Sequence, residues 1–298
     1  MPDIRRFYLV PLRLEELFAA ELWAAGTLGL EIKPHDGERV RIEAYFDEAA
    51  PEPGLAAMGL LGFEEIETVG VEPVPQVDWL ARYRENARPF WVGRRLLLDP
   101  REPDEPPCEV PPGRVLLRLP ARSAFGVGSH ESTRLALELL EDLVEDWAEE
   151  GGLAGRTALE IGAGTAVLSF AALRFGARSA IAFDLDPGAP IHARDNSRLN
   201  DLYPRHFAGR LAALVAPPHP KSRFDLLLLN VLPEEILSEL PDLAERLAPG
   251  GELIFSGILA ERGDEILARV AALGLVERGR RIANEWIAFR LVRAAPGA

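Results

Sequence analysis

One stretch, Thr157–Asp186, constrains the fold most strongly because it holds the pattern of a strand, a glycine turn, a helix and a second strand. Residues Thr157–Ile161 are a short apolar run, which is typical of a buried parallel strand. Gly162-Ala163-Gly164 follows, and glycine lets the backbone come close to a ligand because no Cβ intrudes. A helical pattern then runs through Thr165–Phe175 and is closed by a glycine.

The second strand of this unit, Ser179–Phe183, is followed at once by an acid, Asp184. Asp184 lies 22 residues after Gly162 (184 − 162), a spacing that places an acid at the strand tip. There it can accept hydrogen bonds from ribose hydroxyls. This order of elements predicts a nucleotide-binding βαβ unit.

The glycine pattern also discriminates between cofactors. The dinucleotide fingerprint requires a third glycine where this chain has Val167, which argues against NAD. Glu160, two residues before the first glycine, fits S-adenosylmethionine, which has an amino-acid tail, a sulfonium cation and no phosphate. We therefore expect this cofactor to contact Glu160, Gly162, Gly164 and Asp184. The alternative is a structural glycine turn in another α/β enzyme.

A second glycine segment, Ala124–Thr133 (AFGVGSHEST), leads into a helix that is expected to start near Ser132. The free backbone N–H groups at such a helix start can bind a ligand. We expect Phe125 to stack on adenine or to close over the methionine tail. His130 is a candidate catalytic residue beside the proposed site. The alternative is that Ser129–Ser132 only caps the helix.

The remaining segments after Trp91 are expected to complete a Rossmann-like, seven-stranded sheet of the methyltransferase type. Ligands of open α/β sheets bind beyond the carboxyl ends of the strands, so Asn230, which ends an apolar run, should share a crevice with Gly162 and Asp184. The expected strands in this part of the chain are Trp91–Leu98, Val115–Leu119, Leu211–Val215 (the third of the seven), Phe224–Asn230, Glu252–Ser256, Val276–Arg280 and Trp286–Val292. The expected helices are Pro187–Asn200, Pro233–Leu247 and Glu261–Leu273.

The first part of the chain is expected to be a small α+β domain. Its pattern gives the order βαββαβ, which is that of a ferredoxin-like fold. The expected elements are strands at Arg5–Leu12, Leu28–Lys33, Val40–Phe46 and Glu64–Val74, and helices at Leu14–Ala25 and Pro53–Leu61. The expected domains are therefore residues 1–75, a linker helix over 76–90, and a cofactor-binding domain over 91–298.

Composition limits the setting and the partners. The chain of 298 residues has a net charge of −14, so nucleic acid phosphates would repel it and a basic protein is the better partner. The alternative is that the acidity only keeps the protein soluble. Cys108 is the single cysteine, which excludes an internal disulfide and a cysteine-based metal cluster; we expect no metal. No apolar run is long enough to span a membrane, and we expect a cytoplasmic monomer.

Several segments, in order, are similar to those of the ribosomal protein L11 methyltransferase (PrmA) family. They are AFGVGSHEST, ALEIGAGTAVLSFAALRFGA, FDLDP, FDLLLLN, APGGELIFSGIL and Glu285-Trp286. The resemblance implies methylation of protein amino groups, both lysine ε-amines and an N-terminal α-amine, with S-adenosylmethionine as the cofactor and ribosomal protein L11 as the substrate. It also implies a class I methyltransferase domain preceded by a substrate-recognition domain. It implies cofactor contacts at Thr133, Gly162, Asp184 and Asn230.

The chain departs from the family pattern in three places. Val127 stands where the family has threonine, Ala166 stands where it has a third glycine, and Asn230–Glu234 reads NVLPE where the family has NILA. The last segment is expected to face the substrate. A lysine methyltransferase for a different protein, a non-catalytic cofactor-binding relative and a small-molecule methyltransferase therefore remain as alternatives.

The chemistry expected of this site needs positioning more than a strong base. A neutral amine attacks the sulfonium methyl in line, and the rate comes mostly from orientation. We expect Asn230 to orient the amine and His130 to assist.

Overall fold

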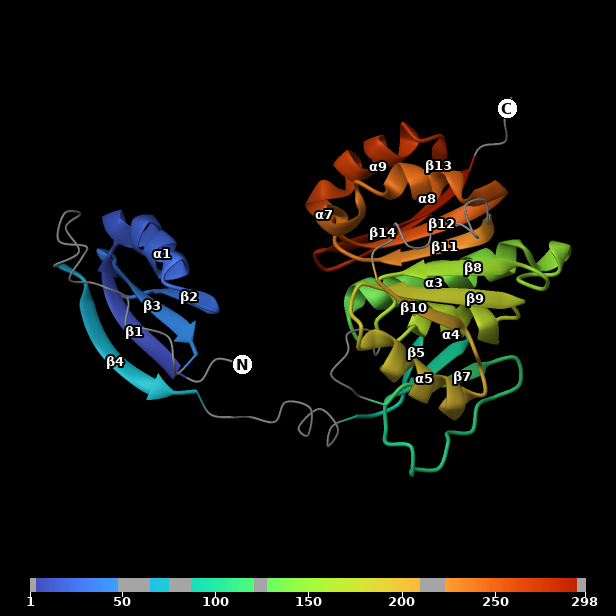
Figure 1. Ribbon diagram of the computed structural model, residues 1–298, viewed down its shortest axis with the longest axis horizontal. Coiled ribbons are helices and arrows are strands. Elements are labelled where there is room, and N and C mark those ends of the chain that lie inside the picture. Colours follow the sequence, from blue (N-terminus) through green and yellow to red (C-terminus); the bar gives the residue numbers. More distant parts are fainter. Residues whose placement is uncertain (1–3, 48–64, 75–86, 121–127, 210–222, 294–298) are drawn as a thin grey trace. The chain divides into compact units, whose positions relative to one another are not determined.

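The computed structural model describes residues 4–47, 65–74, 87–120, 128–209 and 223–293. The chain divides into two compact units, Met1–Asp78 and Trp79–Ala298, which Figure 1 shows in blue to cyan and in green to red. This division falls inside the segment expected to be a linker helix. Most of that segment lies outside the described residues, so the helix stays a prediction.

The first unit contains a four-stranded antiparallel sheet in the order β2-β3-β1-β4. Alternate residues of its central strands pack on helix α1, and Tyr8 meets Phe18 edge to face with ring centroids 5.1 Å apart. The strand order is that of the expected ferredoxin-like fold. The second helix, expected at Pro53–Leu61, lies outside the described residues. The described elements are β1 (Ile4–Pro11), α1 (Glu15–Ala24), β2 (Gly29–Pro34), β3 (Arg39–Phe46) and β4 (Glu67–Pro73).

The second unit is built on the expected seven-stranded sheet, in the order β10-β9-β8-β11-β12-β14-β13. Neighbours pair in parallel from β10 to β12, and β14 pairs antiparallel with both β12 and β13. The strands are β8 (Thr157–Ile161), β9 (Ser179–Asp184), β10 (Arg205–Ala208), β11 (Phe224–Asn230), β12 (Leu247–Leu259), β13 (Leu275–Ala283) and β14 (Trp286–Arg293).

Helices cover both faces of this sheet. Strand β11 shows why, because Leu226 and Leu228 join one apolar core while Leu227 and Leu229 join the other. A strand that is apolar on both sides is typical of a parallel sheet with two helical layers. Figure 1 shows α7, α8 and α9 above the sheet and α4 and α5 below it. The helices are α3 (Glu131–Asp146), α4 (Val167–Arg174), α5 (Ala189–Asn200), α7 (Pro233–Ile236), α8 (Leu240–Glu245) and α9 (Gly263–Ala271).

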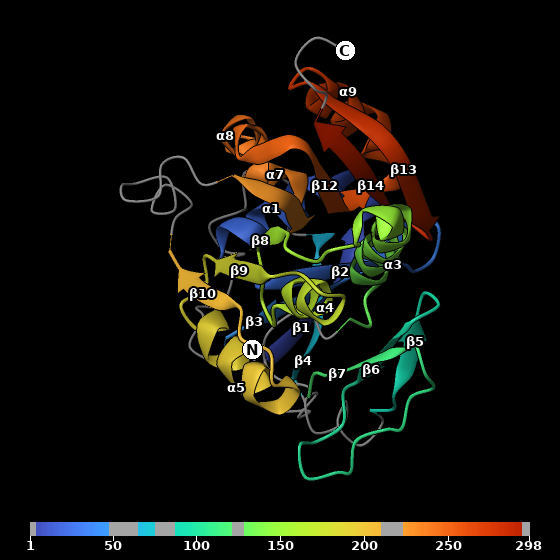
Figure 2. The same cartoon turned by 90° about the vertical axis from the view of Figure 1, so that its right-hand side faces the viewer.

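The segment Trp91–Leu98 was wrong as a single strand. It folds into two antiparallel strands, β5 (Phe90–Val92) and β6 (Leu96–Asp99), and β6 pairs in parallel with β7 (Val115–Arg118). Gly93 makes the turn between them with a φ of 57°, a conformation that favours glycine. Figure 2 shows these three strands as a small sheet set apart from the larger one.

Two further expectations in the second unit need correction. The single helix expected over Pro233–Leu247 is two short helices, α7 and α8, because Pro241 lacks an N–H group and fits only the first turn of a helix. The strand that extends the sheet beyond β9 is β10, Arg205–Ala208. The expected position of that strand, Leu211–Val215, lies outside the described residues.

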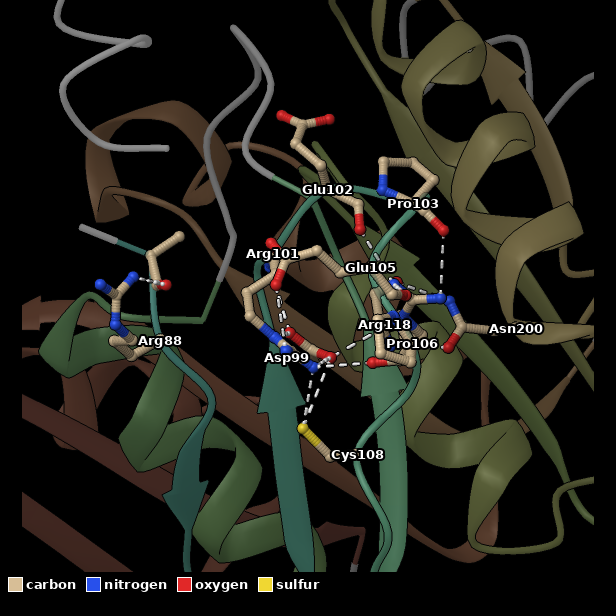
Figure 3. Close-up of polar contacts among 11 residues, drawn as sticks. Arg88, Asp99, Arg101, Glu102, Pro103, Glu105, Pro106, Cys108, Arg118 and Asn200 are labelled. Atoms are coloured by element: carbon tan, nitrogen blue, oxygen red, sulfur yellow. Dashed lines mark hydrogen bonds and ion pairs between the residues drawn. The ribbon is translucent and has the colours of Figure 1, made fainter. Parts of the chain in front are cut away.

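A proline-rich loop between β6 and β7 is held by arginines (Figure 3). Arg118 donates hydrogen bonds to the carbonyl oxygens of Glu102, Pro103 and Glu105, and Arg101 donates to the buried carboxylate of Asp99. Burial raises the pKa of the Cys108 thiol, which accepts from Arg101 at 3.0 Å. The loop therefore has a defined conformation without secondary structure of its own.

Candidate active site

The parallel strands of the large sheet end at one edge, and most of the predicted site residues follow those ends. Ile161 pairs with Phe183 on one side and with Leu229 on the other, while Asn230 pairs with Ser256. The residues that come next on β8, and the last residues of β9 and β11, therefore lie side by side. The expectation that Gly162, Asp184 and Asn230 meet at this edge is confirmed.

The turn after β8 has the backbone geometry that its glycines permit. Gly162 and Gly164 have φ angles of 68° and 50°, and a Cβ on Gly162 would collide with the side chain of Val231. Asp184 accepts hydrogen bonds from the backbone N–H of Gly164 at 2.7 Å and of Asp186 at 2.8 Å. An ionised carboxylate has about four lone-pair sites, so this half-buried side chain keeps acceptor capacity.

A small hollow opens beside Asp184. Two of its side chains, His206 and Phe207 on β10, were missed from the sequence because the third strand was expected further along the chain. Phe207 is 37% exposed, which is high for an aromatic ring next to a carboxylate on the neighbouring strand. The residues that line the hollow are Ala163, Gly164, Ala182, Asp184, Ala189, Pro190, Ala193, His206 and Phe207.

Glu160 lies beneath the glycine turn and is almost completely buried. Its carboxylate oxygens accept the backbone N–H groups of Ser169 at 2.8 Å and of Leu168 at 3.3 Å, near the start of α4. It therefore caps a helix whose own N-cap residue, Ala166, has no side-chain hydrogen bond. Burial raises the pKa of Glu160 to about 7. Its direct contact with the cofactor stays a prediction.

Two predicted residues from distant segments meet at the end of β11. The Asn230 amide nitrogen donates to the hydroxyl oxygen of Thr133 at 2.9 Å, although 97 residues separate them. Thr133 is completely buried, whereas Asn230 is half-buried. Helix α3 thus delivers a hydroxyl to the tip of the fourth strand.

His130 is the N-cap residue of α3. Its Nδ1 accepts the backbone N–H of Ser132 at 3.3 Å and lies 2.8 Å from the Ser132 hydroxyl. Its ring packs edge to face on Trp286, with centroids 5.0 Å apart. The capping alternative is therefore confirmed for His130, and a catalytic role stays a prediction. Phe125 and Val127 lie outside the described residues.

The residues at this edge fit S-adenosylmethionine. The glycine turn leaves space where any Cβ would be blocked, and the carboxylate beside it is suited to hydroxyl groups. Within the described part of the chain no helix is long and apolar enough to cross a membrane. In the same residues no group of three or more histidine, cysteine or acidic side chains is placed to hold a metal ion.

This sheet order, with a glycine turn after its first strand and an acid ending its second, defines a class I S-adenosylmethionine-dependent methyltransferase. A match to a family model extends over residues 24–294, and its description is ribosomal protein L11 methyltransferase (PrmA). The chain belongs to this family.

Relatives with the same description match most of the chain. The ribosomal protein L11 methyltransferase of Pelobacter propionicus is 36% identical over 87% of this chain and 78% of its own. That of Geotalea uraniireducens is 34% identical over 98% of this chain and 94% of its own. The solved structure of ribosomal protein L11 methylase from Lactobacillus delbrueckii subsp. bulgaricus superposes with a TM-score of 0.58 at 27% identity. It covers 69% of this chain and 98% of its own.

Proposed function

We propose that this enzyme methylates amino groups of ribosomal protein L11, both lysine ε-amines and the N-terminal α-amine. The bond between Asn230 and Thr133 carries the proposal, because it holds a polar amide at the same sheet edge as the glycine turn. The names of the relatives, which specify ribosomal protein L11, support this choice of substrate.

The cofactor would be held by the elements that meet at this edge. Asp184 offers acceptors for the ribose hydroxyls, and the turn from Gly162 to Gly164 allows close approach of the backbone. Thr133 and Phe125 would contact it from the segment before and within α3, and Glu160 would support the turn from below. When bound, S-adenosylmethionine supplies a methyl group activated by the sulfonium charge.

The protein would act on the amine by orienting it and keeping it neutral. Asn230 donates through Nδ2 to Thr133, so its Oδ1 is the atom that can accept a hydrogen bond from the amine. Such orientation can supply much of the rate enhancement of a two-reactant step. His130 would assist from the start of α3, where its ring is held against Trp286.

The first unit, residues 1–75, would grip the substrate. The net charge of −14 favours a basic protein and disfavours direct binding of nucleic acid. We propose that the enzyme works in the cytoplasm as a monomer.

One observation favours a second candidate, a lysine methyltransferase for another protein. The segment from Val231 to Glu234 departs from the family pattern, and Leu232 within it is 48% exposed beside the site. An unbound, exposed leucine at this place suits a different substrate surface. A non-catalytic cofactor-binding relative is the remaining alternative.

Mass spectrometry of unmethylated ribosomal protein L11 after incubation with enzyme and cofactor tests the proposal. We expect mass increments of whole methyl groups on lysines and the N-terminus. Labelling of a different protein in a cell lysate, with none on ribosomal protein L11, would favour the second candidate. Cofactor binding without any transfer would favour the non-catalytic alternative.

A further inference from the structure

Ser256 is a buried hydroxyl at the end of β12 that no cofactor or substrate assignment uses. Its Oγ donates to the backbone carbonyl oxygen of Ser132 at 2.7 Å, and its side chain is completely buried. It is also the residue that pairs with Asn230 across the parallel strands. The hydroxyl therefore joins the tip of the sheet to the first turn of α3.

The carbonyl that Ser256 holds belongs to the residue before Thr133. The first turn of a helix has few internal hydrogen bonds, so outside contacts decide where it sits. With Ser132 fixed to β12, the hydroxyl oxygen of Thr133 lies where it receives the Asn230 amide at 2.9 Å. Two hydrogen bonds thus connect the ends of β12 and β11 through one helical turn.

The residue after Ser256 restrains the same place from the other side. Gly257 has a φ of 83°, and a Cβ on it would lie 2.5 Å from the carbonyl oxygen of Val231. The backbone of β12 is therefore packed directly on the residue that follows Asn230. Ser256 sets the partner of the amide, and Gly257 sets the backbone that carries it.

We propose that Ser256 is a positioning residue, which acts through Ser132 and Thr133 to hold the Asn230 amide with its oxygen toward the incoming amine. The inference rests on the proposed function of Asn230. An amide that can rotate presents nitrogen and oxygen alternately, and a donor facing the amine opposes its attack. Without the Ser256 bond the first turn of α3 loses an anchor, and the amide loses its fixed partner.

Two measurements test this proposal, and the first needs neither cofactor nor substrate. In enzyme with isotope-labelled asparagine, the side-chain amide signal of Asn230 is assigned from its loss in Asn230→Asp. We expect Ser256→Ala to shift this signal and to accelerate its hydrogen exchange. Ser197→Ala is the matched control, because this buried hydroxyl also donates to a backbone carbonyl, that of Ala193 at 2.9 Å. It should leave the signal unchanged while lowering the unfolding temperature comparably.

The second measurement is a double-mutant cycle on turnover. Ser256→Ala should lower kcat by about tenfold to a hundredfold, with little change in the affinity for S-adenosylhomocysteine. In the Thr133→Val background the same substitution should cost much less, because residues that act through one another are non-additive. If Ser256→Ala does not yield folded protein, Ser256→Cys keeps most of the volume with only a weak donor.

An unchanged Asn230 signal in folded Ser256→Ala would overturn the proposal, as would additive losses of kcat in the cycle. Failure of the proposed function has a different signature. In that case the wild-type enzyme transfers no methyl group to ribosomal protein L11, while the amide signal still responds to Ser256→Ala. The cycle can then be run with whichever substrate accepts a methyl group.

Discussion

Asp184 and Gly164, 20 residues apart in sequence, are joined by a 2.7 Å hydrogen bond from the glycine N–H to the carboxylate. The acid that ends the second strand thereby fixes the turn that follows the first. The same carboxylate is thus part of the turn's architecture and an exposed acceptor at the site. The glycine turn and the acid therefore work as one structural element.

Asp184→Ala should weaken binding of S-adenosylhomocysteine, because each hydrogen bond to a charged group contributes about 1.5–3 kcal/mol. Titration calorimetry measures the change. Asp186→Ala is the control, since that exposed side chain accepts only within its own turn, from Gly188. Normal affinity in well-folded Asp184→Ala would remove this residue from the cofactor site.

Ala166→Gly should stabilise the protein. Ala166 has a φ of 65°, a left-handed conformation that costs a residue with a Cβ about 1–2 kcal/mol. Part of that gain is lost to the greater freedom of glycine in the unfolded chain, so we expect a rise of about 0.5–1 kcal/mol in the free energy of unfolding. Urea denaturation measures it. Ala171→Gly, inside α4, should instead cost about 1 kcal/mol, and equal losses in the two variants would contradict the strain.

Glu160 should make stability depend on pH. Burial raises its pKa from 4.5 to about 7, so the folded state holds the proton more tightly than the unfolded state. The contribution of Glu160 is therefore greatest below pH 4.5 and is lost as the pH rises to about 7. The loss is roughly 3 kcal/mol at 1.36 kcal/mol per pKa unit.

Glu160→Gln cannot titrate, so the free energy of unfolding of this variant should change less than that of the wild type between about pH 5 and about pH 8. The slope is the readout, because the amide also alters the cap on α4. Urea denaturation across this range measures both proteins. Parallel slopes would show that Glu160 does not titrate in it.

The sequence was sufficient for the elements whose signals are local. The bounds of β8 and β11 match the apolar runs, since such runs between polar ends describe buried parallel strands. The single strand expected over Trp91–Leu98 failed because leucines continue beyond Gly93, and only that glycine signals the turn. Likewise, Pro241 was the available sign that the helix after β11 begins again.

Contacts between distant segments could be located but not detailed. Topology placed Asn230 at the correct edge, yet nothing in the sequence specifies that its partner is Thr133 on α3. Glu160 was interpreted as a ligand contact, and its bonds to the N–H groups of α4 depend on how that helix packs beneath the turn. Such pairings follow from packing, which a one-dimensional pattern does not encode.

The two units should be separable in function. A chain that begins at Trp79 lacks the four-stranded unit and keeps every described residue of the cofactor edge. We expect it to bind S-adenosylhomocysteine normally and to lose most methylation of intact ribosomal protein L11, because binding energy remote from the amine no longer positions it. A short lysine peptide, which does not use the first unit, should be affected less.

The measurement for this truncation is the ratio of kcat/KM for the whole protein to that for the peptide, in both forms of the enzyme. A cooperative unfolding transition establishes that the shortened chain is folded. An unchanged ratio would contradict a substrate-gripping role for the first unit. Loss of cofactor binding in the folded truncation would mean that this unit helps to build the cofactor site.

The most direct test of the central claim compares Asn230→Asp with the wild type in methyl transfer and in cofactor binding. The substitution keeps the shape of the side chain and removes the donor to Thr133. We predict that the affinity for S-adenosylhomocysteine stays nearly the same, while kcat for transfer to ribosomal protein L11 falls by about a hundredfold, because orientation in the transition state is lost. Transfer by Asn230→Asp at the wild-type rate would contradict the account and place the orienting group elsewhere.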